Sequence, residues 1–277
     1  MGNLRAVLAA SVVFAFGCSS KNNTAAVDAP VIPDAPPDAP PDAPPDAPAG
    51  DFTCLHATQG TTADDPITIA GTTGSVGTGG INPIGNVVID VFKTGVATKV
   101  DEVKSLDDGT GAFTTDNLVT GGVPLAGFLE ATLAGSRTTF VFPSNPLAAS
   151  LTGLPVPLVD TATFGLLSQQ VAMVTQDDTK NGAMFVIVTD CVGTRLDKAT
   201  LSVQQAGKDV GTVFYLGGLA AQAVGVYFVF NVPDGATDVS AKFANMQFAT
   251  HTVTAFKANA TDIKDGSITA TNVIPGP

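Results

Sequence analysis

The chain of 277 residues contains no tryptophan, two tyrosines and two histidines. With only Tyr215 and Tyr227, the usual aromatic platform for stacking sugars would be thinly supplied. Neither His56 nor His251 begins a His-x-x-Glu or His-Glu-x-x-His ligand pair. His56 follows Cys54 by two residues, but two ligands do not make a zinc site, so we predict solvated or hydrogen-bonded histidines and no metal site.

Basic residues are also scarce, with 13 Lys and Arg against 25 Asp and Glu and a formal net charge of -12. Five acidic and two basic residues precede Asp51, which leaves -9 on residues 51–277. Phosphate binding needs clustered Lys and Arg, so this balance excludes a nucleic-acid partner. It is equally unsuited to anionic lipid headgroups.

Signatures of catalysis are missing as well. No Gly-x-Ser-x-Gly nucleophile elbow is present, which argues against the corresponding serine hydrolases. Most Asp residues lie beside Gly, Pro or Asn, where turns favour them. We therefore identify no catalytic residue and expect a protein that is not an enzyme, with an unrecognised carboxylate site as a remaining alternative.

The longest apolar run, residues 6–16, is too short to span a bilayer as a helix but suits the core of a signal peptide over residues 1–17. Its ending, Ala15-Phe16-Gly17-Cys18, resembles a bacterial lipobox, although Ala15 stands where Leu is usual. The resemblance implies a lipid on Cys18; the alternative is ordinary cleavage after Ala-x-Gly at the same bond. Ser19, which is not Asp, implies outer-membrane delivery by resemblance to Gram-negative sorting rules.

A proline-rich stalk follows, over residues 18–50. Pro-Asp-Ala-Pro occurs four times in succession from Pro33 to Pro48. Proline fixes φ and lacks an amide donor, so we predict extended polyproline II of about 100 Å in full extension. Its Asp residues recur every four positions against a three-residue turn and therefore spiral around the rod. Such repeats resemble those of myxobacterial lipoproteins.

Residues after Asp51 are rich in Gly, Thr, Val and Ala, and their apolar residues alternate as in half-buried strands. We predict an all-β fold of two consecutive β-sandwiches, over residues 51–158 and 182–277. Residues 159–181 break the alternation, and Asp160 can cap a connecting helix. The candidate strands lie around Ile67, Ile89, Ala112–Thr115, Phe128–Leu133, Thr138–Phe142, Met184–Val188, Leu201, Tyr227–Phe230, Ala241, Val253 and Ile268.

Three short motifs resemble those of carboxypeptidase regulatory-like domains, which are transthyretin-like sandwiches. They are the turn Asp108–Phe113, the strand opening Asp190–Leu201 and the turn Phe230–Gly235. The resemblance implies an immunoglobulin- or transthyretin-like fold and no activity, because such modules are accessory parts of many proteins.

If Cys18 carries lipid, Cys54 and Cys191 remain, an even number in an oxidising compartment. A disulfide between them is our preferred interpretation, with two separate thiols as the alternative. Calcium is a less favoured possibility at two acidic turns, where the spacing does not match a calcium loop and turn formation explains the residues. The carboxylates concerned are those of Asp107, Asp108, Asp116, Asp177 and Asp178.

Three functions remain open at this point. The first is a lipid-anchored protein of the outer membrane, facing the periplasm or the cell surface, that binds a protein or glycan through its sandwiches. The second is a structural envelope spacer, and the third is an enzyme. Exposed apolar loop tips, or a groove lined by a tyrosine, would favour the first over the second.

Overall fold

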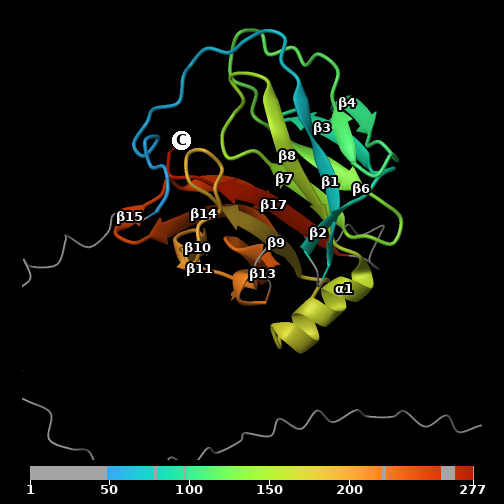
Figure 1. Ribbon diagram of the computed structural model, residues 1–277, viewed down its shortest axis with the longest axis vertical. Helices are drawn as coiled ribbons and strands as arrows, with labels where there is room; N and C mark the ends of the chain where they lie inside the picture. The colour runs from blue at the N-terminus through green and yellow to red at the C-terminus, as the bar shows by residue number, and fades with distance from the viewer. Residues whose placement is uncertain (1–48, 78–79, 97, 220–222, 257–265, 277) are drawn as a thin grey trace, which may run out of the picture. The chain divides into compact units, whose positions relative to one another are not determined.

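The computed structural model describes residues 49–77, 80–96, 98–219, 223–256 and 266–276 (Figure 1). The predicted signal peptide, Cys18 and the repeated part of the stalk lie outside these residues. The described residues belong to one compact unit, Ala47–Pro277. None of the helices within these ranges is long and apolar enough to cross a membrane.

Strands dominate the structure. The first eight are β1 (Ile69–Gly77), β2 (Gly80–Pro83), β3 (Val88–Lys93), β4 (Lys99–Lys104), β5 (Ala112–Thr114), β6 (Gly127–Thr132), β7 (Thr138–Phe142) and β8 (Leu151–Leu158). After the helical segments α1 (Thr161–Leu166) and η1 (Leu167–Val171) come β9 (Asn181–Val188), β10 (Thr200–Gln205), β11 (Lys208–Asp209), β12 (Thr212–Tyr215), η2 (Leu216–Gly218), β13 (Val226–Pro233), β14 (Gly235–Phe243), β15 (Met246–Gln247), β16 (His251–Ala255) and β17 (Ser267–Val273). The predicted all-β class is confirmed.

An eight-stranded central sheet organises the fold, in the order β12-β13-β9-β17-β7-β6-β3-β4. A second sheet has the order β2-β1-β5, with β8 parallel to β1. The third has the order β11-β10-β14-β15, with β16 paired to β14. In Figure 1, β17 runs between β9 and β7, and it is parallel to both.

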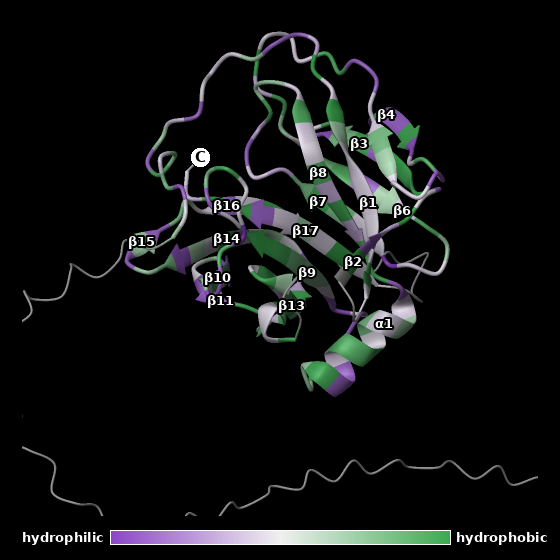
Figure 2. Ribbon diagram, in the orientation of Figure 1, coloured by the Kyte–Doolittle hydropathy of each residue, from purple (hydrophilic) through white to green (hydrophobic). Residues whose placement is uncertain are grey.

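Two hydrophobic cores lie on opposite faces of the central sheet. The first core joins the second sheet to one face along β3, β6, β7, β17, β9 and β13. The second core joins the third sheet to the other face, at β9, β13 and β17. Because β9 is buried on both faces, its run Gly182–Val188 is apolar throughout, as predicted for a central strand. Strand β9 is largely green in Figure 2, whereas β17 beside it also carries pale and purple bands.

This shared sheet changes the expected organisation. Strands from residues 51–158 and from residues 182–277 are hydrogen-bonded neighbours, since β17 pairs with β7 from Ser267–Thr138 to Thr271–Phe142. The two halves are thus two sandwiches built on one sheet and are not laid end to end. Whether either half folds alone stays a prediction.

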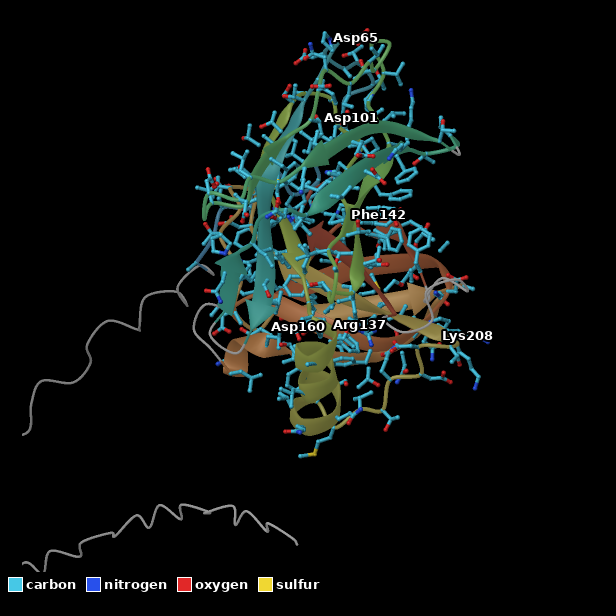
Figure 3. All side chains as sticks on the ribbon, turned by 90° about the vertical axis from the view of Figure 1, so that its right-hand side faces the viewer. Asp65, Asp101, Arg137, Phe142, Asp160 and Lys208 are labelled. Atoms are coloured by element: carbon cyan, nitrogen blue, oxygen red, sulfur yellow. A yellow bond between two sulfur atoms is a disulfide. The ribbon has the colours of Figure 1, made fainter. Side chains whose placement is uncertain are left out.

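The helix expected after residue 159 is present, and Asp160 caps it by accepting a hydrogen bond from the Thr163 backbone N–H at 2.9 Å. The helical segment begins directly after β8, which ends at Leu158, and continues from α1 into η1 as far as Val171. Its Phe164 is buried, and the guanidinium of Arg137 stacks on this ring at 3.5 Å (Figure 3). Leu167, in η1, is also buried, whereas Val171 at the end of this segment is exposed.

Candidate binding surface

The central sheet has one area that no strand among the described residues covers. The second core includes no residue of β3 or β6, and of β7 only Phe142 packs against it. This leaves open the face of β3, β6 and β7 that points away from the first core. Phe142, at the end of β7, is labelled in Figure 3.

Five phenylalanines gather on this open face, and we call them the phenylalanine patch: Phe92, Phe128, Phe140, Phe142 and Phe256. The strand register explains the arrangement. Phe92 pairs with Phe128, and Leu129 pairs with Val141, which sets Phe128 beside Phe142. Residues paired across strands point to the same face, so three rings form one row across β3, β6 and β7.

The rings of the patch are in contact with each other and partly exposed. Ring centroids are 5.0 Å apart for Phe92 and Phe128 and 5.3 Å apart for Phe128 and Phe142. Phe256, at the end of β16, packs over Phe140 with centroids 4.2 Å apart. Of these five, only Phe142 packs against a hydrophobic core. The patch is therefore an apolar surface of its own.

Acidic side chains form the adjacent row. Glu102 pairs with Asp90, Asp90 with Glu130, and Glu130 with Phe140. Like charges directly opposite each other on neighbouring strands destabilise a sheet, so this row needs a cation. Lys99 supplies one by contacting Asp90 at 3.2 Å and also Glu102.

Glu130 is the carboxylate of this row that forms no ion pair with Lys99. It is half-buried and makes no ion pair or hydrogen bond with any residue that the structure describes. Burial raises the pKa of Glu130, and the nearby charge of Asp90 raises it further, while Lys99 acts in the opposite direction. Phe128, two residues away on β6, and Phe140, opposite on β7, flank this carboxylate.

A second feature fixes the chain where it enters the fold. Cys54 and Cys191 form the disulfide that the cysteine count favoured. Beside it, the Asp51 N–H donates to the carboxylate of Asp190 at 2.9 Å, and the Cys191 N–H donates to the Asp51 carbonyl at 2.8 Å. Burial alone would raise the pKa of Asp190, but backbone N–H donors from Asp51, Thr194 and Val192 lower it. We call residues 51–54 with residues 190–191 the N-terminal clamp.

The tyrosines do not form a ligand groove. Tyr227 is 3% exposed and its hydroxyl donates to the Ala199 carbonyl. Tyr215 packs against Tyr227 with ring centroids 4.9 Å apart, and its hydroxyl donates to Asp197. Both side chains therefore support the second core and its edge.

The histidines differ from each other. His56 is exposed, as expected. His251 is buried, and its Nε2 has no hydrogen-bond partner among the described residues, which contradicts the expectation of a solvated or fully hydrogen-bonded ring. Burial lowers the pKa of His251, which favours the neutral form.

The acidic turns considered for calcium are held by local contacts. Asp108 accepts from the Thr110 N–H at 2.9 Å, and Asp177 accepts from the Thr179 hydroxyl at 2.6 Å. Asp178 forms a two-pronged ion pair with Arg137, at 2.8 and 2.6 Å. Within the described ranges no three His, Cys, Asp or Glu side chains gather as a metal site would require. Asp107 and Asp116 take part in none of these contacts, and turn formation remains the favoured interpretation of the acidic turns.

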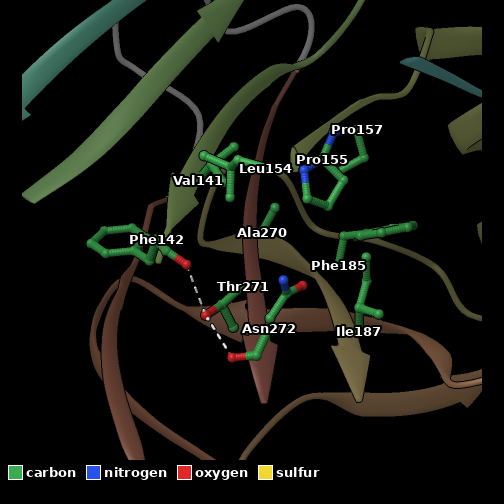
Figure 4. Close-up of a pocket in the computed structure, with 10 residues that line it drawn as sticks. All are labelled: Val141, Phe142, Leu154, Pro155, Pro157, Phe185, Ile187, Ala270, Thr271 and Asn272. Carbon is green, nitrogen blue, oxygen red and sulfur yellow. Dashed lines mark hydrogen bonds between the residues drawn. The ribbon is translucent and has the colours of Figure 1, made fainter. Parts of the chain in front are cut away.

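The cavities are modest. Figure 4 shows one between β8 and the central sheet, lined by Leu154 and Pro155 of β8 and by Val141, Phe185 and Ala270 of the sheet. Its volume of about 10 Å³ leaves room for no more than one water. A larger cleft of about 300 Å³ runs between residues 143–148 and 151–155. None of the described residues lining this cleft is charged, and its size is at the lower limit for ligand pockets.

Exposed apolar loop tips are also present. Val119 and Val123 are 73% and 61% exposed in the loop that precedes β6, and Met173 is 85% exposed after η1. Exposed apolar loop tips were the feature expected of a binding protein rather than of a structural spacer. They are isolated side chains, however, whereas the phenylalanine patch is contiguous.

Comparison with known proteins gives distant similarities. No protein-family model matches the chain, and no curated protein matches it. The Bacillus anthracis TIE protein is 13% identical with a TM-score of 0.25, covering 77% of this chain and 35% of its own. A streptococcal ancillary pilin is 11% identical with a TM-score of 0.23, covering 76% of this chain and 63% of its own.

Two B repeat units of the collagen-binding protein of Staphylococcus aureus are 10% identical to this chain, with a TM-score of 0.23. The match covers 76% of this chain and 48% of the repeat-unit chain. This chain thus spans about a third of the TIE protein and less than two thirds of the ancillary pilin. At these TM-scores the functional argument rests on the chain's own geometry.

Proposed function

We propose that the protein is a non-catalytic, lipid-anchored component of the cell envelope that binds a partner through the phenylalanine patch. The observation that carries this proposal is the contiguous, partly exposed aromatic face on β3, β6 and β7. Large apolar patches on a folded surface mark interaction sites, and aromatic residues are enriched at the centres of interfaces.

The N-terminal clamp supports the tethered arrangement. A lipid on Cys18 and an extended stalk over residues 18–50 would pull on the fold at Asp51. The disulfide connects Cys54 to the turn that follows β9, a central strand, so a pull on the stalk would be transmitted to the sheet before residues 55–66 could peel away. Such a connection suits a folded unit held away from a membrane.

Affinity capture tests the binding part of the proposal. The full chain, extracted in detergent, would be used as bait for native envelope material, beside F128A and the control V119A, which removes an exposed apolar side chain outside the patch. We expect partners that wild type and V119A recover reproducibly and that F128A loses, with circular dichroism confirming that F128A is folded. Recovery of the same partners by all three baits, or of none by wild type, would contradict the proposal and favour a spacer.

Mass spectrometry of the native protein tests the anchor. We expect a mature N-terminus at Cys18 with the mass of attached acyl chains, and partition into the detergent phase. An unmodified Cys18 with partition into buffer would refute the anchor while leaving the patch untouched.

A further inference from the structure

We infer that the phenylalanine patch recognises a cationic group, carried by a Lys- or Arg-bearing segment of a partner protein, with Glu130 as its counter-charge. This inference rests on the proposed binding function and specifies the chemistry of the partner. Aromatic faces attract ammonium and guanidinium groups through the ring quadrupole, and the attraction strengthens where water is excluded. The patch combines such rings with a carboxylate that no described residue neutralises.

The placement of charge on the face identifies where the cation would bind. Lys99 contacts Asp90 and Glu102, at the β4 side of the acidic row. Glu130 lies one strand further in, where β6 meets β7 and where Phe128 and Phe140 flank it. A cation above this point would lie beside the carboxylate and the two aromatic side chains, whose ring centroids are 6.0 Å apart. The chain's only two glutamates, Glu102 and Glu130, both belong to this row.

Charge also decides between the possible occupants of the face. A second copy of this chain would bring a second row of carboxylates and a second unit with net charge -9 against the first. Such a pairing is repulsive, whereas a basic segment is attracted to the same surface. An uncharged glycan could stack on the rings but would leave Glu130 without a counter-charge.

Binding of a simple cationic probe tests the inference. The full chain in detergent would be titrated into fluorescently labelled hexalysine, with Nε-acetylated hexalysine as the uncharged probe, at low and high salt. Two variants address the patch: E130Q removes the charge and keeps the shape, and F128L removes the ring and keeps an apolar side chain. The control D209N removes an exposed carboxylate from β11, in the third sheet.

We expect hexalysine to bind wild type and D209N within twofold of each other, and E130Q and F128L each to bind it about three- to tenfold more weakly. The acetylated probe should bind none of them measurably. Equal weakening in E130Q and D209N would show diffuse attraction to an acidic protein and overturn the inference. Equal binding of both probes would also overturn it, by showing docking that does not depend on cations.

The failure of this inference can be distinguished from failure of the proposed function. If the envelope partner is lost from F128A but still captured by E130Q, the patch binds a partner of another chemistry. If wild type captures no partner, the proposed function fails whatever hexalysine does.

Discussion

Removing the disulfide tests how strongly the N-terminal clamp stabilises the fold. The bond joins Cys54 and Cys191 across a separation of 137 residues. In the chain-entropy model, closing a loop of this length restricts the unfolded chain enough to stabilise the folded state by about 5 kcal/mol. The double variant C54S/C191S should therefore lose close to this amount.

The clamp's other contacts do not need the bond. The Asp51 N–H donates to the carboxylate of Asp190, and the Asp51 carbonyl accepts from the Cys191 N–H. Phe52 stacks on Phe243 with ring centroids 5.8 Å apart. The reduced protein should therefore keep its fold, and the loss should come mainly from the greater freedom of the unfolded chain.

Guanidinium chloride unfolding, followed by circular dichroism, measures the effect. We expect a free energy of unfolding lower by about 4–5 kcal/mol and a larger m-value, because the unfolded variant exposes more surface. Wild type unfolded with a reductant should match the double variant, which controls for the serine substitutions. A loss below about 1 kcal/mol would refute the loop-closure reasoning.

Four further substitutions test the remaining assignments. E130Q should raise the denaturation midpoint at pH 7 and leave it unchanged near pH 3. In the folded state, burial and the charge of Asp90 raise the pKa of Glu130 above its ordinary value of 4.5, so ionisation of this group costs stability as the pH rises above that value. Near pH 3 the group is protonated in both the folded and the unfolded state, and there is no such cost for the substitution to remove. A gain of the same size at both pH values would contradict this. D160A should cost about 1 kcal/mol in chemical denaturation, because the Thr163 N–H loses its acceptor, and an unchanged stability would argue against the cap. F228A, in the first core, should cost about 3–5 kcal/mol, whereas F92A in the patch should cost less than about 1 kcal/mol in the same assay; equal costs would show that the patch is core.

Local alternation predicted most strands well. A strand was predicted around Ile89; in it Val87, Ile89 and Val91 alternate, and all three are buried. Thr138–Phe142 was predicted as a strand and is β7. Alternation reports which residues face a core, and in these strands one face is well buried.

Strand β8 could not be found in the same way, because Pro155 and Pro157 interrupt it. Proline lacks the N–H that a central strand must donate, so such a segment is normally placed outside a sheet. The structure accommodates β8 at an edge, where it pairs with β1 alone. The free side of this strand does not need the missing donors.

The shared sheet and the phenylalanine patch were missed for a common reason. Pairing of β7 with β17 joins residues more than 120 positions apart, and no local pattern specifies it. Alternation of apolar residues predicts strands with one buried and one exposed face, but Val91–Phe92 and Phe128–Leu129 are apolar on both faces. Such strands normally lie between two layers, and here the third sheet stops short of β6.

An apolar face left open on a sheet would ordinarily promote aggregation, and the charges around the patch oppose this. Natural sheets protect exposed edges with lysines and bulges. The edge strand next to the patch is β4, which begins at Lys99 and ends at Lys104. Its register against β3 is irregular beside Phe92. The row from Glu102 to Glu130 repels another acidic chain while it attracts a basic one. The same carboxylates can therefore keep copies of this protein apart and select a partner. For this reason, replacing Glu130 should weaken the binding of a cationic probe and at the same time make the fold more stable at neutral pH.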